Sequence, residues 1–400
     1  MPIQGLRDTS NFVAEQRPKN WRETILLLYP NGKAPLTALT SMMKSKSTDD
    51  AEFNWWEKVK SNQRLTLTAS ITNVQTTLTV GGGGCRGLSI NHILRMEHTG
   101  ELVLVTAAPV SDTAVGSISR GFAGTTATAI TLGAGVNPNF HVVATAFQEG
   151  SPAPAGINYD PTKRFNYTEI FRNTLEMTRT ASKTRLRTGD AVKEAKREAL
   201  ELHSCEMEKA FILGTKVETT FGGKPQRATG GIVSFIDSNN VVSVPSATLN
   251  LSLLEDYMRR IFDYGSSEKM AFCGNRALLV IQQVIRKNST YQLMQGTKEY
   301  GMNVSRLISP FGELVIKSHP LFNEIASDMA SPYYALDAWF LVVDQQELIY
   351  RYLDDTQYQK DLQTNGLDSM SSGYLTEAGL EIHHPKSHFL LKDVAISAVG

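Results

Sequence analysis

Cysteine is scarce in this sequence, which holds only Cys85, Cys205 and Cys273 among its 400 residues. Their odd number and wide spacing argue against a disulfide framework, and the absence of a Cys-x-x-Cys pair excludes a zinc knuckle. Sparse, unpaired cysteine is typical of a protein made in a reducing compartment. The sequence indicates no role for any of the three thiols.

Long hydrophobic runs and a net charge are also missing. No run approaches the roughly 20 apolar residues of a membrane-spanning helix, and the first residues lack the apolar segment of a signal peptide. We therefore expect a soluble protein, made in the cytoplasm and without a membrane partner. The 40 basic and 40 acidic residues give a formal net charge of zero, which argues against a dedicated nucleic-acid binder.

What the chain does contain is ordinary globular material. Hydrophobic residues make up 41% and charged residues 20% of the sequence, enough to build real cores. Because 400 residues exceed what one small core organises, the length predicts two or three structural units.

The most conspicuous motif is the glycine-rich stretch VGGGGCRG at 80–87. A phosphate-binding P-loop requires Gly-x-x-x-x-Gly-Lys-Ser/Thr between a strand and a helix. Here Gly87 is followed by Leu88 and Ser89, and no helix is predicted after them. We predict a glycine turn between strands, in which glycine is favoured for its tolerance of positive φ. A nucleotide-binding enzyme that uses this loop is the minor alternative.

Other candidates for chemistry are the histidines His383, His384 and His388. No acidic or cysteine partner stands at a recognisable metal-ligand spacing, so surface or strand histidines are favoured over a metal site. Cys205 and His203 are two residues apart on a predicted helix and cannot face each other as a catalytic pair. The sequence thus predicts no enzyme, no cofactor and no metal.

The hydrophobic pattern changes along the chain. Residues 1–60 are broken by prolines and read as an arm that gains order by lying on something else. Between 61 and 150 the sequence consists of short strand-like runs, and this pattern predicts a small sheet or barrel. Its strand-like runs are 64–68, 77–80, 101–106 and 140–144, with weaker signals at 117–119 and 127–132 around the segment RGFAGTT.

The remainder predicts a mixture of helices and strands. The strongest helix is at about 190–213, about 36 Å long, with Gly214 as its C-terminal cap and an apolar stripe through Val192, Ala195, Ala199 and Leu202. Another helix is predicted over 168–182. Further predictions are helices at 251–262 and 276–287, strands at 270–273 and 339–344, a hairpin across 310–312, a turn at 345–346 into a strand at 347–353, an irregular polar stretch at 354–372, and strand-like runs at 374–376, 380–383 and 389–395.

The order of these parts, together with several segments, resembles the major capsid proteins of tailed bacteriophages. The segments are TGELVLVTAAP (99–109), ISRGFAGTTATAI (118–130), FNYTEIFRNTLEMTRTAS (165–182), EMEKAFILG (206–214) and PQRATGGIVSFI (225–236). The first two are similar to a pattern in capsid families that carry an extra β-module in the extended loop. No single segment is specific, and their order carries the resemblance.

The resemblance implies an α+β protein with the tailed-phage major capsid fold. It would divide into an N-terminal arm (1–60), an extended loop with an inserted β-module (61–150), a peripheral domain with the long spine helix (151–245), an axial domain (246–350) and return strands of the peripheral domain (351–400). An encapsulin-like shell for protein cargo shares this fold and is the main alternative.

The implied function is that of a structural major head protein. Copies would assemble in the host cytoplasm as hexamers and pentamers that close into an icosahedral head around double-stranded DNA. Portal, scaffolding and decoration proteins would be further partners, and the mature product would be part of the virion. Lys193, Lys196 and Arg197 would form a lumen-facing basic strip, although pairing with neighbouring glutamates is an equal alternative.

Overall fold

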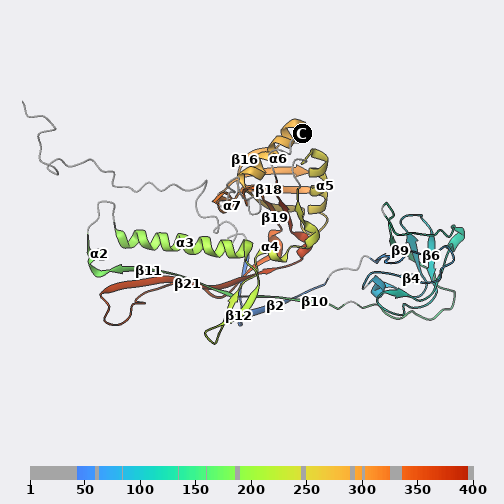
Figure 1. Ribbon diagram of the computed structural model, residues 1–400, viewed down its shortest axis with the longest axis horizontal. Helices are drawn as coiled ribbons and strands as arrows, with labels where there is room; N and C mark the ends of the chain where they lie inside the picture. The colour runs from blue at the N-terminus through green and yellow to red at the C-terminus, as the bar shows by residue number, and fades with distance from the viewer. Residues whose placement is uncertain are drawn as a thin grey trace, which may run out of the picture. The chain divides into compact units, whose positions relative to one another are not determined.

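The computed structural model describes residues 43–58, 63–82, 84–133, 135–158, 160–184, 190–244, 249–288, 293–299, 302–324 and 336–394. Two compact units share the chain: unit 1 is formed by Met1–Trp55 with Arg164–Gly400, and unit 2 by Trp56–Lys163. The strands that connect them, β2 (Glu52–Glu57) and β10 (Thr162–Tyr167), pair with each other (Figure 1).

The predicted N-terminal arm lies mostly outside the described residues. Its described part is more regular than the prolines suggested, because β1 (Lys44–Ser47) and β2 both fall within it. β1 pairs in parallel with a strand of unit 1, and Phe53 and Trp55 of β2 are buried. This part therefore belongs to the folded body of unit 1.

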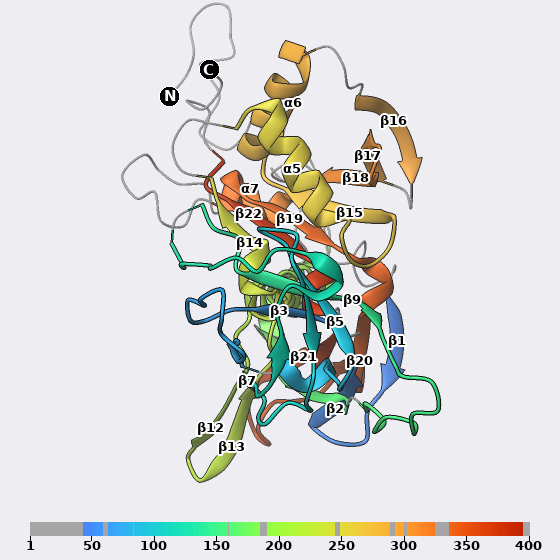
Figure 2. The same ribbon diagram turned by 90° about the vertical axis from the view of Figure 1, so that its right-hand side faces the viewer.

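Unit 2 is built from strands, as the β-branched texture predicted (Figure 2). A five-stranded antiparallel sheet has the order β3-β9-β5-β6-β8, and β4 and β7 form a separate pair. The strands are β3 (Arg64–Thr66), β4 (Leu78–Thr79), β5 (His92–Met96), β6 (Leu102–Val105), β7 (Ala114–Val115), β8 (Ile118–Ser119) and β9 (Asn139–Thr145). Alternate residues face the core, so that Val103 and Val105 are fully buried. Among the predicted strand-like runs of this unit, the run at 127–132 forms no strand and makes a single β-bridge between Ile71 and Ile130.

In unit 1, a long helix lies along a four-stranded sheet with the order β1-β20-β21-β11 (Figure 1). The helix α3 spans Ala191–Leu213, which confirms the prediction. Its N-cap is Asp190, whose carboxylate accepts from the backbone N–H of Val192 and Lys193. Gly214 ends it, as predicted, but with φ −55°. A Cβ there would lie 2.3 Å from the Ala210 carbonyl oxygen, so close packing requires the glycine.

Three sequence predictions about this layer were wrong. Residues 169–178, predicted as helix, form strand β11 (Glu169–Thr178), and only α2 (Arg179–Lys183) is helical. The polar stretch at 354–372 contributes instead to a long hairpin of β20 (Leu348–Gln359) and β21 (Ser369–Ile382). In α3 the predicted stripe fails at Leu202, which is 61% exposed. The buried face runs through Ala199, His203, Met207 and Phe211.

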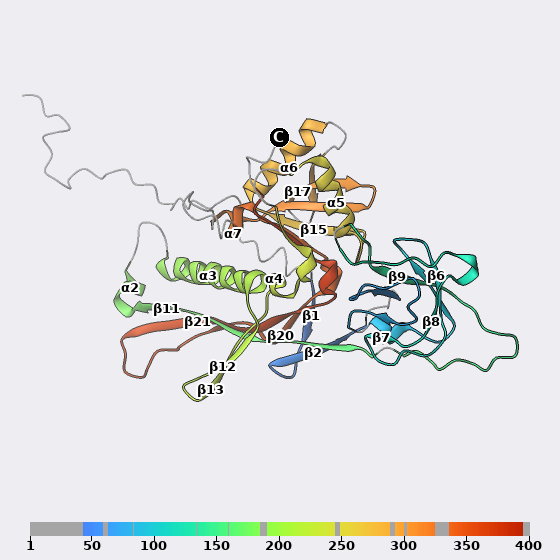
Figure 3. The ribbon, with the colours of Figure 1, turned by 45° about the vertical axis from the view of Figure 1, so that its right-hand side comes forward.

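A seven-stranded mixed sheet forms the other layer of unit 1, in the order β14-β22-β19-β15-β18-β17-β16 (Figure 3). The strand β15 is buried on both faces: Met270 and Phe272 join the core under α3, whereas Ala271 and Cys273 join a second core with α5 and α6. The elements are α4 (Ile232–Phe235), β14 (Val241–Ser243), α5 (Leu251–Ile261), β15 (Glu268–Cys273), α6 (Asn275–Asn288), β16 (Leu293–Glu299), β17 (Met302–Ser309), β18 (Gly312–Ser318), α7 (Pro320–Glu324), β19 (Phe340–Val343) and β22 (Phe389–Lys392).

The predictions for this region were accurate. Both helices, the hairpin between β17 and β18 and the central strands stand where the pattern placed them. The expected α+β class is confirmed. The last strand, β22, pairs with β14 and β19. The segment 351–400 therefore supplies strands to both sheets of unit 1.

Candidate functional site

The two motif segments of unit 2 meet in a buried ion pair. Glu101 stands directly before β6 and Arg120 directly after β8, and these strands are neighbours in the sheet. Nε and Nη2 of Arg120 donate to the two carboxylate oxygens of Glu101, each at 2.7 Å. The side chains are only 6% and 0% exposed, respectively. This is a bidentate pair closed off from water.

The Glu101 carboxylate is the centre of a wider hydrogen-bond network. It also accepts from the backbone N–H of Gly121 and Thr128, both at 3.0 Å. Burial alone raises the pKa of Glu101, but its bonds with Arg120 and the two amides outweigh that effect and lower the pKa overall. Arg120 in turn donates to the carbonyl oxygens of Thr72 and Thr128, both at 2.6 Å. The network joins two loops to the sheet.

The first glycine of the RGFAGTT segment, Gly121, is part of the same local structure. Gly121 has φ +65°, and a Cβ on it would lie 2.7 Å from the Thr125 carbonyl oxygen. The Thr125 hydroxyl donates to the Phe122 carbonyl and accepts from the Leu102 N–H. The motif residues thus hold the module together, which is a structural role.

The glycine-rich stretch at 81–87 is a turn, as predicted, but for a different reason. The described glycines of this stretch do not have positive φ. Gly84 begins a single 3-10 turn that ends at Gly87, and a Cβ on it would lie 3.1 Å from Cγ2 of Val80. Cys85 is buried, and burial raises the pKa of its thiol. A one-turn element without a following helix provides no phosphate cradle.

The C-terminal histidines fall into different environments. His388 is fully buried, and burial lowers its pKa to about 4. Its Nδ1 accepts from the Asp344 N–H at 3.3 Å, and its Nε2 donates to the His383 carbonyl at 3.2 Å. His383 instead lies 2.6 Å from Oε1 of Glu381, which also pairs with Arg351. The expectation of ordinary surface or strand histidines therefore missed a buried one.

Neither a metal site nor a membrane-spanning helix is present in the described parts of the chain. In those residues, no group of three or more histidine, cysteine or acidic side chains is arranged to hold a metal ion. Within the same ranges, no helix combines the length and the apolar composition needed to cross a bilayer.

The predicted basic strip lies on the N-terminal half of α3, and its three members differ. Lys193 is exposed. Lys196 is partly buried, with Nζ 4.8 Å from the centre of the Tyr358 ring. Arg197 lies 3.7 Å from Glu201, one helical turn further on. Two of the three charges therefore have local partners, but only Arg197 has the neighbouring glutamate that the alternative predicted, and the partner of Lys196 is an aromatic ring.

The C-terminal half of α3 is fixed by buried polar contacts that the sequence did not reveal. His203 is 1% exposed and bonds through Nδ1 to Asn173 of β11 (2.7 Å) and through Nε2 to Thr376 of β21 (2.8 Å). Burial lowers the pKa of His203. Glu208 bonds to His319, after β18, at 2.7 Å. One helix is thereby tied to both sheets of unit 1. One hint of these contacts is present in the sequence, which is that His203 and Glu208 lie on or next to the helix face that buries Met207.

A family model described as SU10 major capsid protein matches residues 7–395. The major capsid protein of Pseudomonas phage PaMx41 is 28% identical over 363 residues, which are 88% of this chain and 82% of that protein.

Solved structures are similar at lower identity. A chain from Gordonia phage Cozz has a TM-score of 0.49 at 9% identity, with 98% of this chain and 96% of that chain covered. The SrpI encapsulin of Synechococcus elongatus PCC 7942 has a TM-score of 0.44 at 10% identity, covering 60% of this chain and 79% of its own. The family model runs through both units and nearly from end to end of the chain. The chain therefore belongs to the SU10 major capsid protein family.

Proposed function

We propose that copies of this phage capsid protein assemble as hexamers and pentamers, which close into an icosahedral head around double-stranded DNA. The observation that carries the proposal is the family match over residues 7–395. The fold supports the proposal because much of the chain lies outside the two hydrophobic cores of unit 1. The 56–163 unit and the exposed hairpins provide surface for contacts with other copies.

We assign the regions of the chain accordingly. Residues 1–60 include an arm that reaches onto neighbouring copies, and 61–150 form the extended loop with its β-module. The peripheral domain comprises 151–245, with α3 as spine helix, and receives return strands from 351–400. The axial domain comprises 246–350 and lies at the capsomer centre.

The packaged DNA would be a non-specific partner. Lys193, Lys196 and Arg197 are the proposed contacts, facing the lumen. Because Lys196 and Arg197 already have local partners, Lys193 would contribute most. Such contacts depend on phosphate charge and weaken steeply with added salt. Portal, scaffolding and decoration proteins complete the proposed partners, and assembly takes place in the host cytoplasm without enzyme activity of this chain.

The direct test is the assembly state of the purified chain. Sedimentation and negative-stain electron microscopy should show capsomers of five or six copies, or closed shells of megadalton mass. A folded chain that stays monomeric at all concentrations would refute the proposal. Removing residues 1–40, which precede β1, should impair assembly and leave both units folded; unchanged assembly would refute the proposed role of the arm.

DNA-filled, tailed particles in the microscope would distinguish a phage head from a cargo compartment. The nucleotide-binding alternative has its own test. ATP or phosphate that raised the unfolding temperature of the native chain, but not of a variant with bulky residues at Gly82 and Gly84, would support it.

A further inference from the structure

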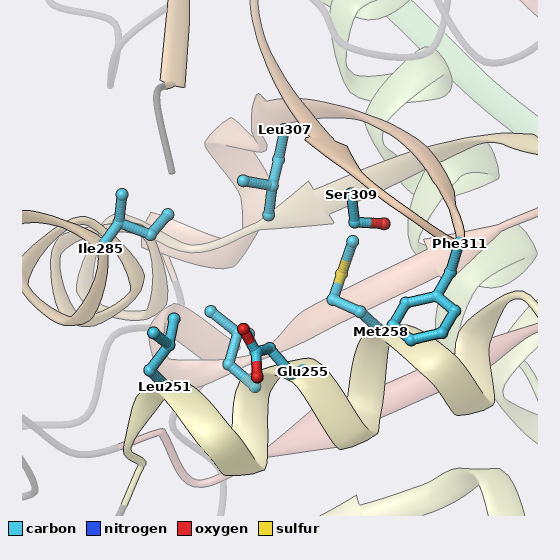
Figure 4. Close-up of a pocket in the computed structure, with 8 residues that line it drawn as sticks. Leu251, Glu255, Met258, Ile285, Leu307, Ser309 and Phe311 are labelled. Carbon is cyan, nitrogen blue, oxygen red and sulfur yellow. The ribbon is translucent and has the colours of Figure 1, made fainter. Parts of the chain in front are cut away.

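An apolar hollow lies between α5, α6 and β17, and its free space, counted out to the solvent, is about 290 Å³ (Figure 4). Met258 and Leu307 are among the residues that line it. Its two polar lining residues are already engaged: Glu255 interacts elsewhere in the chain, and the Ser309 hydroxyl donates to a carbonyl of its own turn at 2.8 Å. Because a binding site needs a few polar groups to orient its ligand, this hollow selects no particular chemistry.

The tip of the β20–β21 hairpin, which lies beside α2 (Figure 1), carries an exposed amide side chain. Asn365 and Gly366 are the two central residues of its turn, and both are exposed. Neither the Asn365 amide nor the Gly366 N–H makes a hydrogen bond to a described residue, and no atom lies within 4 Å of a Cβ placed on Gly366. By contrast, the turn between β12 (Val217–Phe221) and β13 (Lys224–Ala228) has glycine at both central positions and no amide side chain. An amide carbon and a backbone nitrogen therefore lie next to each other, uncovered, at the β20–β21 tip.

Within the described chain, a single hydrogen bond spans the four residues of this turn. The Leu367 N–H donates to the Thr364 carbonyl at 3.2 Å, and the φ of +90° at Gly366 is that of a type II turn. Next to the turn, Asp368 pairs with Arg179 at 2.6 Å, but the two side chains are 64% and 70% exposed. An ion pair in water restrains the chain weakly. The turn can therefore open without disturbing the strands of the hairpin.

We propose that Asn365 is a site of spontaneous deamidation, with water as the co-reactant. The backbone nitrogen of Gly366 forms a bond to Cγ of Asn365, the Cγ–Nδ2 bond breaks, and the proton of the Gly366 N–H leaves with Nδ2 as ammonia. Water then opens the resulting cyclic imide at either of its carbonyl carbons, which gives aspartate or isoaspartate. Glycine permits the first step because it has no side chain to obstruct the approach. Reactions of this kind make asparagine a thermolabile residue.

The modification changes the charge and the backbone of the hairpin tip. It adds a carboxylate to a tip that already carries Asp361 and Asp368, both of them exposed. Isoaspartate also routes the backbone through the former side-chain carbon, which lengthens the turn by a methylene group. Because the tip lies outside both hydrophobic cores of unit 1, we expect the surface charge to change and the stability of unit 1 to stay the same. The reaction does not depend on self-assembly.

Peptide mass spectrometry of the purified native chain tests the site. After incubation in mildly alkaline buffer, the peptide with Asn365 should gain the mass of an amide-to-acid conversion and contain isoaspartate. The conversion should be slower in mildly acidic buffer, because the backbone N–H must lose its proton. Asn54 and Asn137 are controls in the same sample, since both are exposed. Asn54 precedes the bulky Trp55, and Asn137 precedes Pro138, which has no N–H, so neither should convert.

The folded turn should slow the reaction only slightly. Because a single hydrogen bond spans it, Asn365 should convert in the native chain at a rate within about 10-fold of the rate in the urea-unfolded chain. Asn365→Gln should reduce conversion at this position to the level of the control asparagines, because glutamine would have to form a larger ring. The proposal would be overturned by a native chain that stays unmodified while the unfolded chain converts. Aspartate formed without isoaspartate, or equal conversion at Asn54, would overturn it as well.

Discussion

The buried pair of Glu101 and Arg120 makes a quantitative prediction about unit 2. Replacing Arg120 with methionine removes both bonds to the carboxylate and leaves a charge inside the core. A buried charge stripped of its partner costs about 3–5 kcal/mol. We therefore expect Arg120→Met to destabilise unit 2 by that amount.

The sequence offers a matched control in the same unit. Arg64 and Glu97 form an equally short bidentate pair, at 2.7 and 2.6 Å, but the side chains are 47% and 18% exposed. Because water screens an exposed pair, Arg64→Met should cost less than about 1 kcal/mol. Burial is the main variable that separates the two substitutions.

Hydrogen exchange measures this difference within unit 2 alone. The amides of β6 (Leu102–Val105) should exchange roughly 100-fold faster or more in Arg120→Met, and less than about 10-fold faster in Arg64→Met. Adding Glu101→Leu to Arg120→Met should recover part of the loss, since it removes the buried charge. It leaves two amides without an acceptor. Equal losses in the two arginine variants would refute the reasoning.

Three further predictions concern other parts of the chain. Gly214→Ala should destabilise unit 1 by about 2 kcal/mol or more in urea unfolding, because the new Cβ would collide with the Ala210 carbonyl. Gly82→Ala is the control and should be nearly neutral, because the space around Gly82 is open. The pKa of His388 is about 4 in the folded chain, against an ordinary 6.5. The resulting stability is fully present above pH 6.5 and is lost as the pH falls toward 4, on the order of 3 kcal/mol in total. Unfolding curves that gave the same stability at every pH from 7.5 to 4.5 would contradict this prediction. Lys193→Gln should reduce the salt slope of DNA binding by about one unit, measured by titration at several salt concentrations, and an unchanged slope would remove Lys193 from the proposed strip.

The predictability of the fold followed the strength of local signals. The helix over 190–213 was correct because a charged sequence between an N-cap aspartate and a glycine has few alternatives. Strand β11 was mistaken for a helix because Phe171 and Leu175, four apart, fit both one helix face and alternate positions of a strand. Pairing with β21 along ten residues decides in favour of the strand. That partner lies far away in sequence, where local periodicity carries no information.

The sites show the same limit. The resemblance of the chain to phage capsid proteins is confirmed by the family match, but nothing in the spacing of the segments 99–109 and 118–130 shows that Glu101 and Arg120 bond to each other. His388 looked like part of a surface cluster because three histidines are close in sequence. Its burial comes from β19 and β22 closing around it. The basic strip stays a prediction.

The pairing of β2 with β10 has a consequence for how this chain varies over evolution. The segment 56–163 leaves the rest of the chain and returns to it through two strands that are hydrogen-bonded neighbours. An insertion whose ends are adjacent can be shortened, exchanged or deleted without moving either flanking strand, since a hairpin turn spans the same gap. Unit 2 also has its own hydrophobic core. The segment 56–163 is therefore a self-contained insertion. If a short turn replaced it, unit 1 should still fold.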